Sequence, residues 1–270
     1  MIKLSSYHTH CTFCDGKNTP REMVERAIEL GCAEIGFSSH SPLSCKNSWC
    51  MDKSEVPLYI DTIRSLREEY KDKIRLYIGI EQDILSSPCD VGFDYVIGSV
   101  HHVESNGRSY GVDASKDVTR DAVMNGFDGD VTAYYKAYFE AVSQVYDKTH
   151  CDIIGHFDLL AKFSELDPLI SESDPEYIRL RDSSIDALLE TPAVFEVNTG
   201  AISRGYRTVP YPHPDALERI KRAGKPVIVT SDTHAVSTLD FMINETAERL
   251  SASGFKVIKS MDELLEYTRK

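Results

Sequence analysis

The sequence predicts an α/β fold in which seven strand–helix units form a single-domain, TIM-like barrel. Seven strand-like runs alternate with helical patterns, and this alternation implies parallel strands, because each connection must cross back over the sheet. The 270 residues, 41% of them hydrophobic, are enough for one large core. Side chains that can bind metal ions follow most of these runs, and reactive residues in such barrels lie at the C-terminal ends of strands.

The first helix has the best-defined ends. Thr19 can cap it, Pro20 suits its first position and Glu22 can complete a capping box. Apolar residues then recur on one face as far as Gly31, which favours a stop. We therefore expect a helix that starts at Pro20 and ends before Gly31.

The other elements are marked by short apolar runs or by apolar residues with a helical period. We expect strands over residues 2–7, 33–38, 75–80, 95–100, 152–155, 193–197 and 227–230. We expect further helices over residues 58–70, 132–146, 176–189, 215–223, 239–250 and 261–268. Ser260 and Glu263 offer a second capping box at the last helix. Residues 104–129, rich in Gly and Asp, are expected to form a long loop of the kind that is often a lid or a disordered segment.

Composition narrows the possible partners. The formal net charge is -13, and an acidic surface repels nucleic acid backbones, whose binding depends on Lys and Arg. Neither a secretory leader nor an apolar run of membrane length is evident, so we expect a cytoplasmic protein with reduced thiols and no nucleic acid or membrane partner. Cys11 and Cys14 form a C-x-x-C motif, which we interpret as ordinary buried or loop thiols.

Six histidines and three carboxylates at or beside the strand ends are candidate metal ligands. They are His8, His10, Asp15, His40, Glu81, His101, His156, Asp232 and His234. Each has an ordinary explanation by itself, such as a hydrogen-bonded histidine, a turn or a salt bridge. A single polynuclear metal site explains all nine residues at one end of the fold. Without it, each residue would need a separate explanation. A doubly wound open sheet, the alternative fold, would spread these residues along one edge, so they also favour the barrel.

The motifs that carry these residues resemble those of the PHP family, named for polymerase and histidinol phosphatase. They are His8-Thr9-His10, Cys14-Asp15-Gly16, Ser38-Ser39-His40-Ser41, Gly79-Ile80-Glu81, Gly98-Ser99-Val100-His101, Gly155-His156-Phe157-Asp158, Asn198-Thr199-Gly200 and Ser231-Asp232-Thr233-His234. The resemblance covers nearly the whole chain and is closest to the histidinol-phosphate phosphatase branch. It implies one metal-dependent phosphoesterase domain over residues 1–270, folded as a distorted (β/α)7 barrel. Lys162 departs from the pattern, since some relatives are expected to have arginine there.

The resemblance also implies three divalent ions, with Glu81 bridging two of them. The implied ligand groups are His8, His10, Glu81 and Asp232 for the first ion, Glu81, His101 and His156 for the second, and Asp15, His40 and His234 for the third. All these ligands are nitrogen or oxygen atoms, which suit Zn, Mn or Fe better than Ca or Mg. Three ions carry six positive charges and the carboxylates remove three. The excess of about three positive charges favours a phosphate dianion.

The implied reaction is hydrolysis of L-histidinol phosphate to L-histidinol and phosphate, in histidine biosynthesis, by a metal-bound hydroxide that attacks phosphorus. A small phosphorylated molecule is therefore the expected partner. Lys162, Arg204 and Arg207 follow the fifth and sixth strands and are candidates to bind the phosphate. His102 is a candidate catalytic acid for the leaving group or a substrate contact, and Asn198 a candidate to orient the substrate.

Three other functions remain open at this stage. A PHP enzyme of this kind could act on another small phosphate, such as a nucleotide monoester or bisphosphate. Some family members are accessory domains of DNA polymerases, but no polymerase domain is evident in this sequence. An amidohydrolase-type metallohydrolase usually needs a lysine that bridges two metals, and no lysine ends a predicted strand.

Overall fold

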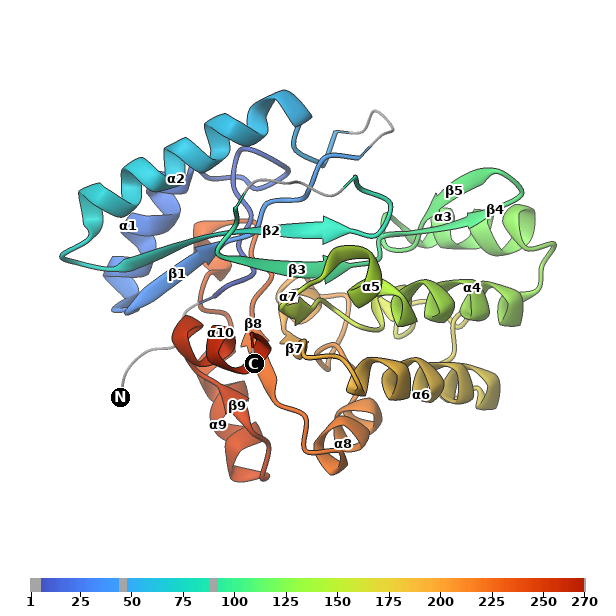
Figure 1. Ribbon diagram of the computed structural model, residues 1–270. Helices are drawn as coiled ribbons and strands as arrows, with labels where there is room; N and C mark the ends of the chain where they lie inside the picture. Colours follow the sequence, from blue (N-terminus) through green and yellow to red (C-terminus); the bar gives the residue numbers. More distant parts are fainter. Residues whose placement is uncertain (1–5, 44–47, 88–91, 270) are drawn as a thin grey trace.

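Seven parallel strands form one curled sheet, which confirms the predicted α/β class (Figure 1). The computed structural model describes residues 6–43, 48–87 and 92–269. The strand order is β1-β2-β3-β6-β7-β8-β9. Their bounds are β1 Glu34–Phe37, β2 Arg75–Asp83, β3 Tyr95–Ser99, β6 Ile153–Ile154, β7 Val194–Asn198, β8 Val227–Thr230 and β9 Val257–Ile258. The sequence did not predict β9, whose two residues are too few to show a period.

The N-terminal segment links the two sides of the curled sheet. Most of the predicted strand 2–7 lies outside the described residues, but residues 6–10 run between β1 and the segment after β8, where Thr9 forms an isolated bridge with Thr233. Carbonyls of this segment accept bonds from Gly36 and Ser38, at 3.1 and 2.9 Å. Two further bonds, of 2.9 and 3.1 Å, join it to Thr233. Because His8 and His10 belong to this segment, they enter the site from the seam that closes the sheet.

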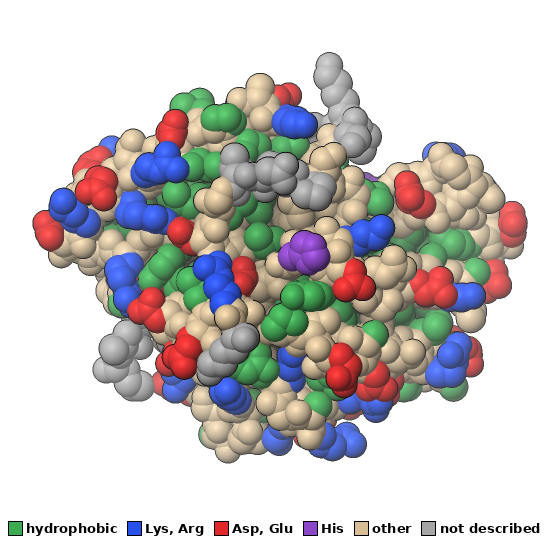
Figure 2. Space-filling model, in the orientation of Figure 1, with side chains coloured by type: hydrophobic (Ala, Val, Ile, Leu, Met, Phe, Trp, Pro, Cys, Tyr) green, Lys and Arg blue, Asp and Glu red, His purple; other side chains and the backbone are tan. Residues whose placement is uncertain are grey.

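Helices cover the outside of the sheet, with α1 and α2 beside β1 and β2, and α4, α6 and α8 side by side farther along it (Figure 1). The helices are α1 Pro20–Leu30, α2 Val56–Tyr70, α3 Lys116–Asp121, α4 Val131–Ser143, α5 Val145–Thr149, α6 Pro175–Leu189, α7 Gly200–Ser203, α8 Pro214–Arg222, α9 Ile243–Ala252 and α10 Met261–Thr268. No described helix has the length and apolar character needed to cross a membrane. On the face that Figure 2 shows, acidic and basic side chains are mixed.

Capping explains where two of these helices start. The predicted box at α1 is present, because Thr19 accepts from the backbone of Glu22 and the Glu22 carboxylate accepts from the backbone of Thr19. At α10 only half of the second predicted box forms. Ser260 caps the helix, but the Glu263 carboxylate accepts from the backbone of Lys259, at 2.9 Å.

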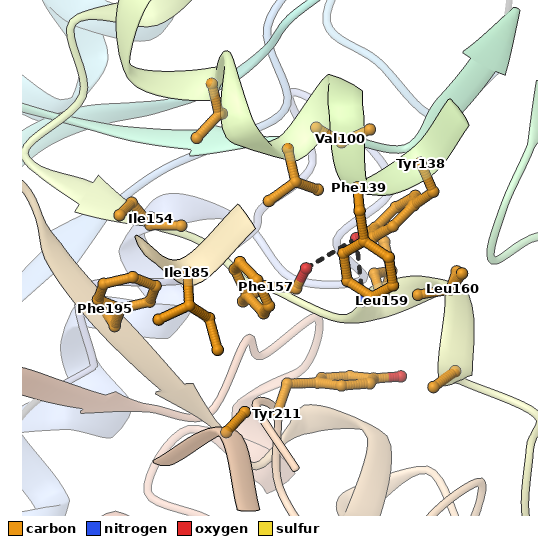
Figure 3. Close-up of a cluster of buried hydrophobic side chains, with 14 of the residues drawn as sticks. Val100, Tyr138, Phe139, Ile154, Phe157, Leu159, Leu160, Ile185, Phe195 and Tyr211 are labelled. Atoms are coloured by element: carbon orange, nitrogen blue, oxygen red, sulfur yellow. Dashed lines mark hydrogen bonds between the residues drawn. The ribbon is translucent and has the colours of Figure 1, made fainter. Parts of the chain in front are cut away.

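A large apolar cluster fixes the segment that follows β6. Phe139 from α4, Ile185 from α6 and Phe195 from β7 pack around Phe157 (Figure 3). The hydroxyl of Tyr138 donates to the Phe157 carbonyl at 3.2 Å and accepts from the backbone of Leu159 at 3.0 Å, as the dashed lines in Figure 3 show. This packing holds the turn that begins directly after β6.

Inside the barrel, one aromatic ring accounts for the glycine of the Gly79-Ile80-Glu81 motif. A Cβ atom at Gly79 would lie 2.3 Å from the ring of Tyr95, which is fully buried. The hydroxyl of Tyr95 donates to the carbonyl of Phe37 at 3.1 Å, so the ring cannot withdraw without breaking that bond. Glycine at this position therefore lets β2 pass close to Tyr95 and present its last residues at the open end of the sheet.

The predicted loop over residues 104–129 was wrong. Two short strands, β4 His102–Ser105 and β5 Arg108–Gly111, form an antiparallel hairpin, followed by α3 and a π-helix over Ala122–Gly126. Asn106 and Gly107 form its turn with φ of 52° and 74°, and Asn-Gly is a strong hairpin signal that the prediction passed over. The predicted helix 239–250 also starts late, at Ile243, because Met242 is left-handed with φ of 54°.

Candidate metal centre

The nine predicted ligands lie together at the open end of the sheet. Each follows a strand, ends one, or belongs to the segment that closes the barrel, as parallel strands in a barrel lead one to expect. The histidines at the floor are fully buried, whereas Asp15 and His234 reach the surface, with side chains 35% and 24% exposed. The cluster therefore runs from a closed interior to an open mouth.

Glu81, the carboxylate near the end of β2, is the centre of the cluster. Its Oε2 atom lies 3.3 Å from Nε2 of His8 and 3.6 Å from Nε2 of His10. Asp232 faces the same two rings, with Oδ1 3.7 Å from His8 and 3.3 Å from His10. These are the side chains of the first implied ligand group.

The other oxygen of Glu81 faces a different pair of rings. Its Oε1 atom lies 2.8 Å from Nε2 of His156 and 3.3 Å from Nε2 of His101. The hydroxyl of Ser99 also donates to this oxygen, at 2.7 Å. One carboxylate thus joins two groups of imidazoles, which is the geometry of a bridging ligand.

A third group lies nearer the mouth. Oδ1 of Asp15 is 3.3 Å from Nε2 of His234 and 3.7 Å from Nε2 of His40. His40 also contacts the central group, because its Nδ1 lies 2.7 Å from Oε2 of Glu81. The His10 and His234 rings stack with centroids 4.0 Å apart, so the outer and central groups are continuous.

The residues fit divalent metal ions. Ligand atoms about 2.1 Å from one ion in tetrahedral geometry lie roughly 3.4 Å apart, and the separations here are close to that value. Four buried atoms that face the cluster make no hydrogen bond of acceptable geometry with a described residue, although the last two lie 2.7 Å apart: His8 Nε2, His10 Nε2, His40 Nδ1 and Glu81 Oε2. Each such atom costs about 1–3 kcal/mol if nothing binds it. Bound cations account for all four.

The sequence did not identify Glu196, a buried carboxylate beneath the cluster. It lies within β7, and its Oε1 is 2.6 Å from Nδ1 of His8. Its Oε2 accepts from the backbone of His156, also at 2.6 Å. Burial alone would raise the pKa of Glu196, but His8 outweighs that effect and holds the pKa below its ordinary value. One feature of the sequence could have identified Glu196: it is a carboxylate within the otherwise apolar run Val194–Val197.

Asp83 has a similar position beside His101 and was also missed. Its Oδ2 lies 3.0 Å from Nδ1 of His101 and accepts from the His101 backbone at 2.9 Å. Burial opposes ionisation, yet hydrogen bonding to His101 lowers the pKa of Asp83. Asp83 and Glu196 are thus outer carboxylates, each of which holds the ring of a candidate ligand.

A cavity of about 590 Å³ opens above the cluster. The candidate ligands form part of its floor, and Trp49, Leu159 and Tyr206 contribute to its walls. Lys162 and Arg204, two of the predicted phosphate contacts, also line it. A small molecule inside would therefore meet cations, aromatic surface and the metal cluster together.

Both cations are already paired with carboxylates. Nζ of Lys162 lies 3.0 Å from Oδ2 of Asp113, a residue of the segment after the hairpin. Arg204 donates to the Asp232 carboxylate and carbonyl, each at 3.0 Å. Burial would raise the pKa of Asp113, but Lys162 outweighs it and the pKa falls to about 2. These pairs hold the cations at the cavity wall.

His102 lines the cavity and stacks on Trp49, with ring centroids 5.7 Å apart. Burial lowers the pKa of His102, so its neutral form is favoured near neutral pH. Arg207 and Asn198 do not belong to the described cavity lining, contrary to expectation. Arg207 is buried against Glu172, at 2.9 Å. Asn198 donates to Glu196 and accepts from the backbone of Gly200, so neither side chain is available to a substrate in this arrangement.

The two cysteines of the C-x-x-C motif are thiols, as expected. Burial raises the pKa of Cys14 to about 12, and its Sγ lies 3.4 Å from Nδ1 of His10. Cys11 is fully buried, with Sγ 3.3 Å from the hydroxyl of Ser39. Neither cysteine belongs to the clusters that could hold a metal in the described part of the chain.

Comparisons with known proteins agree with this geometry. A family model described as "PHP domain" matches residues 6–200. A probable histidinol-phosphatase from Deinococcus radiodurans is 26% identical over 271 residues, which cover 96% of each chain. The histidinol-phosphatase of Bacillus subtilis is 25% identical over 270 residues, 90% of this chain and 97% of the relative.

Solved structures share the fold. A histidinol phosphate phosphatase from Lactococcus lactis, in complex with zinc, L-histidinol and phosphate, superposes with a TM-score of 0.70 at 23% identity, covering 96% of both chains. A putative histidinol phosphatase from Listeria monocytogenes gives a TM-score of 0.71 at 22% identity, covering 87% of this chain and 96% of the relative. These likenesses establish a TIM-like barrel for the present chain.

Proposed function

The chain belongs to the PHP domain family, and we propose that it is a metal-dependent phosphomonoesterase that hydrolyses L-histidinol phosphate to L-histidinol and phosphate. One observation carries the proposal: nine potential ligands converge beneath a cavity that is lined by Lys162 and Arg204. Two relatives named histidinol-phosphatase align with 90% or more of this chain. A structural relative is complexed with zinc and both products of that reaction.

We propose that the nine side chains hold three divalent ions, of zinc, manganese or iron, in the three groups described above. Their close ligand distances and unpaired buried atoms support this number. The family match ends at residue 200, yet Asp232 and His234 complete two of the groups. We therefore place the functional domain over the whole chain, residues 1–270.

The chain's own residues would bind and orient the phosphate. When bound, the ions supply a water activated near neutral pH and positive charge beside the phosphoryl oxygens. Arg204 and Lys162 face the cavity from the wall, where guanidinium and ammonium groups can donate to the same phosphate. Each gives up part of its bonding to Asp232 or Asp113 as it turns towards the phosphate.

Other wall residues suit the organic part of the substrate. Trp49, Leu159 and Tyr206 offer apolar and aromatic surface to an imidazole ring. The carboxylate of Asp113 reaches the same cavity and can accept from an ammonium group. His102 lies on the wall beside Trp49, and because burial favours its neutral form we propose it as a hydrogen-bonding contact of the substrate and not as the acid for the leaving group.

Steady-state kinetics on a panel of phosphate esters tests the proposal. L-histidinol phosphate should give a far higher kcat/KM than p-nitrophenyl phosphate, nucleotide monoesters or bisphosphates. It alone carries both an amine for the Asp113 carboxylate and an imidazole ring for the aromatic wall residues. Turnover of L-histidinol phosphate no faster than that of p-nitrophenyl phosphate would exclude it as the substrate. A nucleotide or bisphosphate that gave the highest kcat/KM would identify a different phosphatase of the same family.

A further inference from the structure

We propose that Glu196 is a positioning residue that prepares two of the metal groups at once. Its side chain is fully buried beneath the cluster and touches neither the cavity nor the substrate position. It contacts His8, a candidate ligand of the first group, and His156, a candidate ligand of the second. The inference rests on the proposed metal centre but concerns the folding of its ligands, not the choice of substrate.

Each oxygen of Glu196 has two hydrogen-bond partners. Oε1 lies 2.6 Å from Nδ1 of His8 and accepts from the hydroxyl of Thr230 at 2.6 Å. Oε2 accepts from the backbone of His156 at 2.6 Å and from the amide of Asn198 at 3.0 Å. An ionised carboxylate accepts only, so all four partners must donate. No neutral side chain of this size can accept four such bonds.

This bonding fixes which nitrogen of His8 is free. Because Oε1 can only accept, the proton of the neutral ring lies on Nδ1, and Nε2 keeps its lone pair. Nε2 lies 3.3 Å from Oε2 of Glu81 and 3.7 Å from Oδ1 of Asp232, and it has no hydrogen-bond partner in the described structure. Glu196 therefore selects the tautomer of His8 that can bind a metal.

The location of Glu196 lets one side chain act on three strands. It belongs to β7, which lies between β6 and β8 in the sheet. His156 follows β6, and Thr230 is the last residue of β8. Asp83, by contrast, binds only one candidate ligand, since its Oδ2 contacts both the ring and the backbone of His101. Glu196 therefore contacts candidate ligands of two metal groups, whereas Asp83 contacts a candidate ligand of one group only.

The variant Glu196→Gln tests this role with little change of volume. If the amide nitrogen takes the place of Oε1, it donates to Nδ1 of His8 and drives the ring proton onto Nε2, the atom that faces the first group. If it takes the place of Oε2, it opposes the backbone N–H of His156. Either orientation breaks the contact to one ligand, and the neutral amide oxygen that remains accepts less strongly than a carboxylate from the other. Both groups are therefore disturbed, and we expect zinc affinity about 10–100-fold weaker, the range found when outer-shell partners of metal ligands are lost.

The measurement is zinc binding without substrate. Zinc per chain is determined by elemental analysis after dialysis, and affinity by competition with a fluorescent chelator, for wild type, Glu196→Gln and the matched variant Asp83→Asn. We expect Glu196→Gln to lose zinc from two groups and Asp83→Asn from one. Wild-type affinity in Glu196→Gln, or a loss no greater than that of Asp83→Asn, overturns the inference. A wild type that binds neither zinc, manganese nor iron overturns the proposed function instead.

Two further readouts separate positioning from a general effect on folding. A purely structural role lowers the Tm of metal-free and zinc-loaded protein equally, whereas a positioning role reduces the rise in Tm that zinc produces. If Glu196→Gln does not fold, the tautomer of His8 can be read in the zinc-loaded wild type from its long-range ¹H–¹⁵N couplings. Protonation at Nδ1 supports the inference, and protonation at Nε2 overturns it.

Discussion

Removal of the central carboxylate is the most informative perturbation of this site. In Glu81→Ala, the first proposed group falls from four ligands to three and the second from three to two. Since the loss of an outer-shell partner alone weakens metal binding about 10–100-fold, the loss of a direct ligand from both groups should be larger still. Only the group of Asp15, His40 and His234 stays complete, so bound metal should fall from about three ions per chain to about one. The excess of about three positive charges then falls to about zero.

Elemental analysis of dialysed protein and kinetics with L-histidinol phosphate measure both consequences. Glu81→Ala should lose two of three ions and nearly all activity, while a control at an exposed glutamate, Glu104→Ala, should keep both. Full metal content in Glu81→Ala would refute the bridging role, whatever the activity. Loss of activity with full metal content would assign Glu81 to catalysis and not to metal binding.

Three other outcomes follow from the structure. Arg204→Met, assayed at saturating zinc because Arg204 also binds the Asp232 carboxylate, should lower kcat/KM about 10–100-fold by weakening the hold on the phosphate; unchanged kinetics would remove Arg204 from the substrate site. Phe139→Ala, in the core shown in Figure 3, should lower the free energy of unfolding by about 3–5 kcal/mol in urea denaturation, whereas Leu58→Ala, 60% exposed, should change it little. Burial opposes protonation of His101, but Glu81 and Asp83 outweigh it and raise its pKa in the metal-free protein. Zinc must therefore displace a proton there, so zinc affinity and activity should fall as the pH drops, beginning above the ordinary histidine pKa of about 6.5, and a flat profile to pH 5 would contradict histidine ligation.

The sequence predicted the strand–helix order and the gathering of nine polar side chains because both depend on local patterns. A barrel places the ends of its parallel strands together, so a residue such as His101 needs only its position after an apolar run to be located. Glu196 could not be recognised in this way. The role of Glu196 depends on its contact with His8, which lies 188 residues earlier in the chain. The pattern of residues within a strand carries no information about such a distant partner.

The predicted substrate contacts show the same limit. Lys162 and Arg204 line the cavity, as their place after strand ends led us to expect, but Arg207 is held against Glu172 below it. The two arginines look alike in the sequence, and only the path of the chain after α7 places Arg204 at the cavity and Arg207 against Glu172. The Asn106-Gly107 turn was a local signal, so the hairpin could have been predicted; the two-residue strand β9 could not.

The seam formed by residues 6–10 has a consequence for biosynthesis. Its two histidines are synthesised more than two hundred residues before Thr233 and His234, which complete the seam and the outer group. The nascent chain therefore cannot assemble the full cluster until that later segment has been synthesised. Closure of the barrel and capture of the last ion should consequently occur together.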